Sequence, residues 1–323
     1  MNSVCVIGVY FGKFSNYFNL WLLSCQYNPQ IDFYIVTDQP IDRALPQNIH
    51  FIVKNLSEFS ALAERKLQTH VELKRAYKCC DLKPFYGIIL EDYIQNYKYW
   101  GHCDFDLIFG DLLYFMQEYN YTDYDKFLHL GHLSFYRNTN TINQYYKEAG
   151  SLCGDYKQVL ANEKNVAFDE IPGIVSIYQK NKHSLFIKKI FADISSRHFR
   201  YCLSTFCILD GQKIKNYREQ IFYWERGKVF RAYYWKGEMH IEEYMYIHFQ
   251  RRPNYTVEFK PFQVMAFFIT PYGFIPKDGP VTRRIIKQYN RRSMIPLYES
   301  YEYFKWYITN KKNSMLRKLG LGE

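Results

Sequence analysis

The chain has 323 residues and a formal net charge of +10 at pH 7, and 48% of its residues are hydrophobic and 20% aromatic. A chain of this length and apolar content can bury a large core, which excludes intrinsic disorder. The charge is concentrated near the C-terminus, where residues 281–323 hold ten Lys and Arg against three acidic residues. The nearly neutral remainder argues against a protein that coats nucleic acid with its whole surface, so we expect no nucleic-acid partner.

The expected lack of a targeting segment and the pattern of cysteines predict a cytoplasmic protein. An apolar run at Val4–Tyr10 already predicts a strand, so we expect no signal peptide before the fold. The longest apolar stretch, near residues 264–269, is too short to span a bilayer. The eight cysteines form no C-x-x-C pair, which favours reduced, buried thiols over a zinc site or disulfides.

The N-terminal part alternates strand and helix patterns. In chain order we predict a strand at Val4–Tyr10, a helix at 16–25, strands at 33–38 and Ile49–Val53, and a helix at 57–67 with Ser57 as its cap. Pro84 divides residues 72–96 into two helices. A strand follows at 97–103, and Asp111 is expected to cap a helix that ends near residue 119. This order predicts an α/β fold with a mostly parallel central sheet and helices on both faces.

The second half is less regular. Residues 226–236 predict a hairpin region with Gly227 and Gly237 in the turns. Residues 244–252 predict a strand that ends in the basic pair Arg251 and Arg252.

The most informative residues are Asp104 and Asp106, directly after the strand at 97–103. In an extended segment residues i and i+2 point to the same side, so both carboxylates can reach one point. Mg²⁺ takes one or two carboxylates and fills its remaining positions with water and phosphate oxygens. Lys13 and Asp38 also fall at carboxyl ends of predicted strands, where α/β proteins bind ligands. We therefore expect one site for a metal–diphosphate at this edge, although a solvated turn would also account for the two aspartates alone.

Other common site motifs are missing from the sequence. There is no G-x-x-x-x-G-K-[ST] loop and no dinucleotide-binding glycine pattern, which weakens ATPase and NAD-enzyme interpretations. No Ser nucleophile elbow is present either.

Four motifs, in this order and spacing, resemble bacterial GT-A-fold glycosyltransferases of capsular and cell-surface polysaccharide synthesis. They are YFGK at 10–13, followed by Thr37-Asp38, then YKCCDLKP at 77–84, WGHCDFD at 100–106 and GHLSFYRN at 131–138. The likeness covers roughly residues 3–252. It implies a GT-A (Rossmann-like) nucleotide-sugar-binding fold and a hexosyltransferase activity.

The resemblance also implies roles for individual residues. Asp104 and Asp106 would bind Mn²⁺ or Mg²⁺ across the diphosphate of a nucleotide-sugar, and His248 would complete the metal shell. Contacts to the donor, a UDP-sugar by expectation, would come from the following residues: Tyr10, Gly12, Lys13, Asp38, Asp81, Lys83, His132, Arg137 and Arg251.

Glycosyl transfer also needs a carboxylate near the anomeric carbon, because the transition state resembles an oxocarbenium ion. In an inverting enzyme this carboxylate deprotonates the acceptor hydroxyl. Asp169 and Glu170 are the candidates, since they are adjacent in a predicted loop after the segment at 131–138. An ordinary exposed acidic turn is the alternative.

We divide the chain into a glycosyltransferase domain at 1–252 and a basic, aromatic C-terminal extension at 253–323. Apolar and basic residues alternate in the extension, which suits either the anionic inner face of the cytoplasmic membrane or a helical layer packed on the sheet. By resemblance the acceptor would be a polyprenyl-diphosphate-linked oligosaccharide of capsule, O-antigen or exopolysaccharide synthesis. The protein would then be cytoplasmic and peripheral to the membrane.

Two other classes of protein remain as alternatives. A sugar nucleotidyltransferase uses a similar sheet but normally carries a Gly-rich basic loop after its first strand, which residues 11–14 match poorly. A non-catalytic carbohydrate-binding or nucleic-acid-binding protein is the other, and a sharply salt-dependent affinity for duplexes would favour the latter.

Overall fold

The computed structural model describes residues 2–40, 45–196, 200–250 and 255–290. Within these residues the strands form three sheets, and the largest has the order β3-β2-β1-β4-β7-β6-β8. Its strands are β1 (Val4–Tyr10), β2 (Ile31–Thr37), β3 (Ile49–Val53), β4 (Tyr99–Cys103), β6 (Lys126–Phe127), β7 (Leu133–Arg137) and β8 (Leu185–Phe186). β3, β2, β1 and β4 run parallel, whereas β7 is antiparallel to both β4 and β6. The α/β fold with a mostly parallel central sheet is therefore confirmed.

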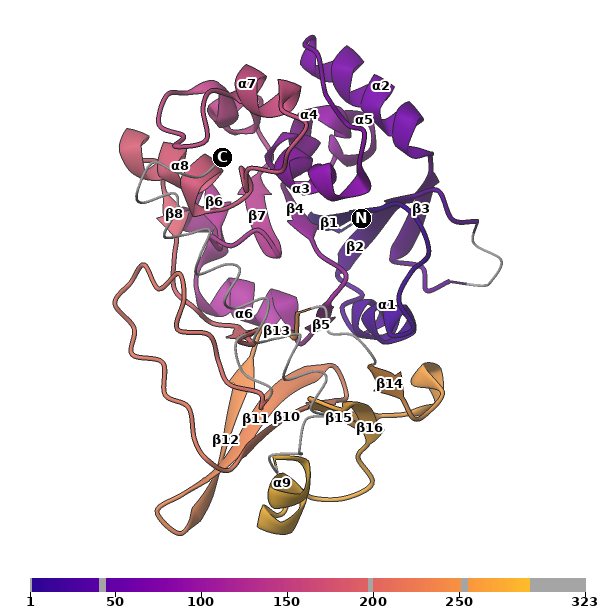
Figure 1. Cartoon of the computed structure of the whole chain (residues 1–323), viewed down its shortest axis with the longest axis vertical. Helices are drawn as coiled ribbons and strands as arrows, with labels where there is room; N and C mark the ends of the chain where they lie inside the picture. The colour runs from indigo at the N-terminus through magenta and orange to yellow at the C-terminus, as the bar shows by residue number, and fades with distance from the viewer. Residues whose placement is uncertain (1, 41–44, 197–199, 251–254, 291–323) are drawn as a thin grey trace, which may run out of the picture.

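Helices lie on both sides of this sheet (Figure 1). The described α-helices are α1 (Phe18–Gln26), α2 (Leu56–Leu67), α3 (Cys79–Leu82), α4 (Tyr86–Ile89), α5 (Glu91–Ile94), α6 (Leu112–Glu118), α7 (Tyr156–Ala161), α8 (Ser176–Asn181) and α9 (Arg283–Tyr289). Short 3₁₀ turns at Ala76–Lys78, Lys83–Phe85, Tyr121–Asp123, Ile142–Lys147 and Pro261–Gln263, and a π turn at Ile171–Val175, join them.

The continuous apolar run of β1 contributes to two core layers. Val4 and Val6 pack with α1 and α6, while Cys5 and Ile7 pack with α2 and the helices that follow it. Successive side chains of a strand point to opposite faces, so a strand covered on both sides must be apolar throughout. Fully burying one such side chain stabilises the fold by about 1.5–3 kcal/mol.

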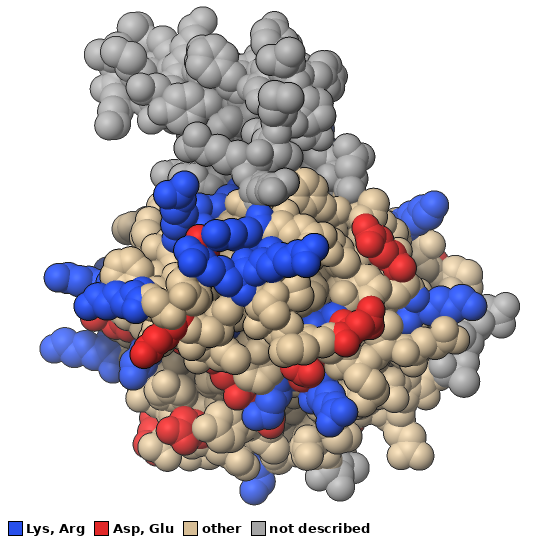
Figure 2. Space-filling view, turned by 90° about the horizontal axis from the view of Figure 1, so that it is seen from below, with Lys and Arg blue, Asp and Glu red and all other residues tan. Residues whose placement is uncertain are grey.

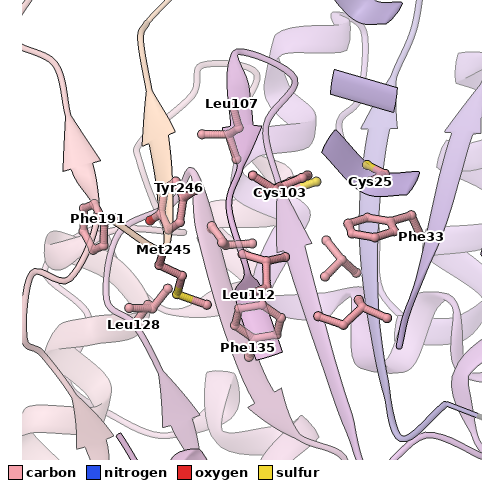
Figure 3. Packing of buried hydrophobic residues seen from close by; sticks show 14 of the residues in the cluster. Cys25, Phe33, Cys103, Leu107, Leu112, Leu128, Phe135, Phe191, Met245 and Tyr246 are labelled. Atoms are coloured by element: carbon pink, nitrogen blue, oxygen red, sulfur yellow. The ribbon is translucent and has the colours of Figure 1, made fainter. Parts of the chain in front are cut away.

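A small three-stranded sheet lies beside the central sheet. It consists of β5 (Leu107–Phe109), β13 (Tyr246–His248) and β9 (Ala192–Asp193), with β13 in the middle. Figure 3 shows how its residues Leu107, Tyr246 and the adjacent Phe191 pack in the same core cluster as Cys103 and Phe135 of the central sheet. This packing joins segments that lie more than one hundred residues apart in the sequence.

A six-stranded sheet lies below the other two (Figure 1). In spatial order its strands are β12 (Glu238–Tyr244), β11 (Lys228–Trp235), β10 (Gln220–Glu225), β15 (Ala266–Thr270), β16 (Gly273–Pro276) and β14 (Thr256–Val257). The hairpin prediction is confirmed, because Arg226-Gly227 and Lys236-Gly237 form the two turns with positive φ angles. Such turns match the twist of the paired strands. Strands from both sides of residue 252 pair in this sheet.

Some local predictions differ from the structure. The cap of α2 is Asn55 rather than Ser57, because the Asn55 side chain accepts from the Glu58 N–H in a capping box. Residues 76–94 form a series of short helical turns instead of two helices, with Pro84 at the start of one turn. Asp111 caps α6 as expected.

No helix among the described residues has the length and apolar character needed to cross a membrane. The eight cysteines are free thiols, and five of them are buried. Residues 255–290 of the C-terminal extension are described and hold β14, β15, β16 and α9, whereas the rest of the extension lies outside the described residues.

Candidate metal and donor site

Asp104 and Asp106 follow β4 at the carboxyl edge of the central sheet, and Phe105 between them anchors the segment. The Phe105 ring packs among aromatic rings that include Tyr10 and Trp21, with centroids 5.4 and 4.9 Å away. A Cβ on Gly8 would lie 2.4 Å from this ring, so a side chain at position 8 would displace Phe105. Residues 105 and 106 form a bend rather than extended strand, and ligand atoms of the two carboxylates lie within 4.8 Å of each other.

Strand pairing brings His248 to this pair of carboxylates. β13 runs antiparallel to β5 with His248 opposite Leu107, the residue after Asp106. His248 Nε2 lies 3.5 Å from Asp106 Oδ2. One donor atom from each of Asp104, Asp106 and His248 can be chosen so that all lie within 4.8 Å of one another. The structure thus brings together all three residues predicted to bind the metal.

Two further residues surround His248, and the sequence analysis missed one of them. Asp193 lies opposite His248 on β9, and its Oδ1 is 2.9 Å from His248 Nδ1. His132, expected as a donor contact, stacks on the His248 ring at a centroid distance of 4.3 Å. His132, Asp193 and His248 form a second group with ligand atoms within 4.8 Å. β9 is a two-residue strand, so no periodicity in the sequence could have identified Asp193.

The charges around His248 are strongly coupled. Burial disfavours the His248 imidazolium, but Asp106 and Asp193 outweigh it and raise the pKa to about 10. Against the effect of burial, His248 in turn lowers the pKa of Asp106. Burial, assisted by His248, holds the pKa of His132 well below its ordinary value. His132 Nε2 is buried and has no hydrogen-bond partner among the described residues, so this nitrogen is free to contact a bound ion or ligand.

These residues fit a divalent cation. Two carboxylates and an imidazole are ligands that Mn²⁺ and Mg²⁺ accept. An imidazole that ligates a metal usually has its other ring nitrogen bonded to a carboxylate. Asp193 would do so for His248, through the 2.9 Å contact at Nδ1.

Lys83 links the aspartate pair to the candidate catalytic loop. Its buried Nζ lies 2.7 Å from Asp104 Oδ1 and 3.0 Å from Asp169 Oδ2, and it donates to the Gly131 carbonyl at 2.9 Å. Burial opposes the ammonium, but Asp104 and Asp169 raise the pKa of Lys83 well above its ordinary value. Lys83 therefore stays protonated and fixes Asp104 relative to Asp169.

Asp169 and Glu170 differ in environment. Asp169 is buried against Lys83, and burial raises its pKa. Glu170 is partly exposed, and burial followed by the neighbouring Asp169 charge raises its pKa to about 7. A Cβ on Gly131 would meet both side chains, at 2.3 Å from Asp169 and 3.0 Å from Glu170, so position 131 must lack a side chain.

Asp81 anchors the loop at residues 166–170 and lies in the interior of the protein. It is fully buried, its Oδ2 is 2.7 Å from Lys78 Nζ, and its carboxylate accepts from the backbone N–H groups of Val166 and Phe168. Both carboxylate oxygens are therefore engaged by the protein. The structure gives Asp81 the position of a support for residues 166–170 rather than of a donor contact.

The loop after β1 lies at the same edge of the sheet. Gly12, with φ of +94°, donates its N–H to Asp38 Oδ1 at 2.9 Å. Hydrogen bonds from Gln39 and from Gly12 lower the pKa of Asp38, which is exposed. Tyr10 donates its hydroxyl to the Lys13 carbonyl and packs against Phe105. These four predicted donor contacts thus lie together, and Tyr10 connects them to the aspartate pair.

One predicted donor contact, Arg137, is not brought to this edge of the sheet. β7 is antiparallel to β4, so Arg137 pairs with Tyr99 at the opposite end of β4 from Asp104. The Arg137 guanidinium donates there to the carbonyl of Thr122 and lies near Asp125. Arg251 lies outside the described residues.

The fold and this cluster define an α/β protein with a candidate divalent-metal site at the carboxyl edge of its central sheet. The chain belongs to the family of unknown function DUF6625, whose model matches residues 6–278. No curated protein matches it.

Several solved glycosyltransferase structures are similar to part of this chain. An active-site mutant of LgtC is 11% identical, with a TM-score of 0.34 over 60% of this chain and 79% of that chain. GlyE of Streptococcus pneumoniae TIGR4 is 12% identical, with a TM-score of 0.32 over 58% of this chain and 45% of that chain. Mouse xyloside xylosyltransferase 1 is 4% identical, with a TM-score of 0.32 over 58% of this chain and 86% of that chain. Similarity at this level assigns no activity to the chain.

Proposed function

We propose that this protein is a metal-dependent GT-A-type glycosyltransferase that transfers a sugar from a nucleotide-sugar, a UDP-sugar by expectation, to an acceptor hydroxyl. The observation that supports this most directly is the convergence of Asp104, Asp106 and His248 within 4.8 Å at the carboxyl edge of a parallel sheet. This edge is where α/β proteins bind phosphorylated ligands.

Mn²⁺ or Mg²⁺ bound there would offset the charge that grows on the leaving diphosphate. Asp104, Asp106 and His248 would hold the ion, and Asp193 would orient His248 through its Nδ1. Lys83 keeps Asp104 in place through a 2.7 Å ion pair and so preorganises the site before the donor binds.

The nucleoside would lie on the loop after β1. Gly12 leaves this loop without a side chain, and no heavy atom comes within 4 Å of a Cβ placed there. A ligand can therefore approach the backbone closely. Tyr10, Lys13 and Asp38 surround this position with a ring, a cation and a carboxylate, which suit the base, the phosphates and the ribose hydroxyls.

Glu170 is the better placed of the two candidate bases. A general base works best with a pKa near the operating pH, and the pKa of Glu170 is about 7. Asp169 instead has its Oδ2 bonded to Lys83, so it acts as a positioning residue. In this assignment Glu170 takes the proton of the acceptor hydroxyl as the bond to the anomeric carbon forms.

We further propose a lipid-linked oligosaccharide as the acceptor, in bacterial surface polysaccharide synthesis at the inner face of the cytoplasmic membrane. Support comes from the exposed cations of α9, which are Arg283, Arg284 and Lys287. Lys and Arg side chains gather on part of the molecular face at this end of the protein (Figure 2). Clustered cations favour contact with anionic lipid headgroups.

A thermal-shift screen tests the donor and the metal. Purified full-length protein is heated with UDP-, GDP-, CMP- and dTDP-sugars, each with Mn²⁺, Mg²⁺ or EDTA. A ligand that binds the native state alone raises the melting temperature by mass action. We expect a rise with one nucleotide class that is lost in EDTA and in Asp104→Asn. The matched control is Asp123→Asn, an exposed aspartate away from the cluster, which should keep the full rise. Absence of any rise in folded wild-type protein would refute the proposal.

A further inference from the structure

A pocket of about 390 Å³ lies behind the metal cluster, on the side of β9. Its walls come from α6, from residues 188–191 just before β9, from parts of the loop between β9 and β10, and from β11 and β12. This loop runs beside the β11–β12 hairpin in Figure 1. The volume falls within the range of small-molecule and cofactor sites, and no role above uses this space.

The pocket has a positively charged rim. Lys188, Lys213 and Lys215 line it and are exposed. The ion pairs found among the described residues engage Lys189 and Arg231 deeper in the pocket, with Asp193 and Glu242, but none of the three rim lysines. Glu242 and Glu243 also line the pocket, but they pair with Arg231 and Lys228. The positive charge of the rim lysines is therefore available to an anionic ligand.

Flat aromatic surfaces complete the lining. The rings are those of Phe115, Tyr119, Phe191, Tyr217 and Tyr244. Phe115 and Phe191 are buried, whereas Tyr119, Tyr217 and Tyr244 are partly exposed and can contact a ligand. Apolar and aromatic side chains hold a ligand in such a pocket, while charged and polar groups fix its orientation. A concave pocket with a cationic rim and aromatic walls fits one or a few acidic sugar units, whereas a membrane or a duplex would need a broad exposed face.

The pocket shares a wall with the metal cluster. Lys189, in the pocket wall, lies 3.2 Å from Asp193, which in turn contacts His248 at 2.9 Å. Phe191, in the same wall, stacks on Tyr246 and packs edge-on against His132. Lys188 and Asp193 are five residues apart along the chain, and five residues span at most about 18 Å when fully extended, so the two backbones lie within that distance. The pocket and the metal cluster therefore adjoin across the wall formed by Lys189 and Phe191.

We propose that this pocket binds an acidic saccharide, one that bears carboxylate or phosphate groups, as the acceptor of the reaction. The assignment of the saccharide as acceptor rests on the proposed glycosyltransferase function, whereas binding itself does not. Lys188, Lys213 and Lys215 pair with the acidic groups, and the aromatic walls hold the sugar rings.

Isothermal titration of the full-length protein tests this binding, in EDTA and without nucleotide. The probes are hexagalacturonate as an acidic saccharide, maltohexaose as a neutral one of equal length, and inorganic phosphate. The variant is Lys213→Glu/Lys215→Glu. Lys157→Glu/Lys164→Glu, two exposed lysines on and just after α7, is the control with the same change in net charge. Lys188→Gln provides an independent change at the rim.

We expect hexagalacturonate to bind more tightly than maltohexaose or phosphate. Its affinity should fall at least about tenfold in Lys213→Glu/Lys215→Glu, as expected when two ion pairs are lost. It should fall less in Lys188→Gln and stay unchanged in the control. Equal weakening in the control would show unspecific attraction, and phosphate binding as tight as hexagalacturonate would show no recognition of sugar. Either result, or no binding by folded wild-type protein, overturns the proposal.

The donor-induced thermal shift separates this inference from the proposed function. Lys213→Glu/Lys215→Glu should keep the shift seen with metal and donor, because the rim lysines lie outside the metal cluster. A shift without saccharide binding would refute the pocket alone. Saccharide binding without any donor shift would leave the pocket in place and refute the transferase.

Discussion

Replacing Glu170 with Gln should make the protein more stable at high pH and less active. Burial raises the pKa of this carboxyl from 4.5 to about 7. A carboxyl whose pKa is higher in the folded chain contributes stability below its unfolded pKa, and loses that contribution as the pH rises through its folded pKa. For a fully buried carboxyl, this difference in pKa between the folded and unfolded chain corresponds to about 3 kcal/mol of stability. Because Glu170 is partly exposed, we expect Glu170→Gln to be about 1–3 kcal/mol more stable than wild type at pH 8 and nearly equal at pH 4.5.

Urea unfolding at pH 4.5, 6 and 8 measures this difference, with Glu163→Gln as the control because Glu163 is an exposed glutamate of the preceding loop. With the donor found by thermal shift, kcat/KM should fall about 10²–10⁴-fold in Glu170→Gln. In wild type kcat/KM should rise with pH through about 7, as Glu170 loses its proton. A stability difference that does not change with pH would refute the burial argument, and wild-type kcat/KM in Glu170→Gln would refute its role as base.

Three further predictions concern the residues that support the site. Asp193→Asn should weaken Mn²⁺ binding about 10–100-fold in titration calorimetry, because His248 loses the partner that orients it; unchanged affinity would show that Asp193 is not needed. Lys83→Met should lower the free energy of unfolding by about 3–5 kcal/mol, since it leaves Asp169 buried and uncompensated. Adding Asp169→Asn to Lys83→Met should recover part of the lost free energy of unfolding. Strictly additive effects of the two substitutions would contradict the coupling between Lys83 and Asp169. Asp81→Asn should destabilise the protein by a similar amount in urea unfolding, because it breaks the buried pair with Lys78; a higher KM for the donor at unchanged stability would instead favour a donor contact.

The positions of the strands and of the aspartate pair follow from local sequence. Val4–Tyr10 is apolar throughout because both of its faces are covered. The sequence also places Asp104 and Asp106 directly after β4, while the bend at residues 105 and 106 belongs to the folded structure. Parallel strands share their carboxyl edge, so the nearness of the loop after β1 could be predicted without knowing the packing. His248 joined this set only through the family resemblance, and the structure places it there by the pairing of β13 with β5.

Strand direction and long-range pairing decided the rest. Arg137 ends a strand in the sequence, but β7 runs antiparallel to β4, so its end lies at the far edge from Asp104. Asp81 lies in the motif at 77–84, which does not reveal its partners, and no sequence pattern marks Asp193. Asp81 is a buried support because it contacts Lys78 and the backbone of residues 166–168. Asp193 contacts His248 because the two-residue strand β9 pairs with β13. Local patterns determine which side of a strand a residue occupies, whereas the partner across a contact depends on how distant segments pack.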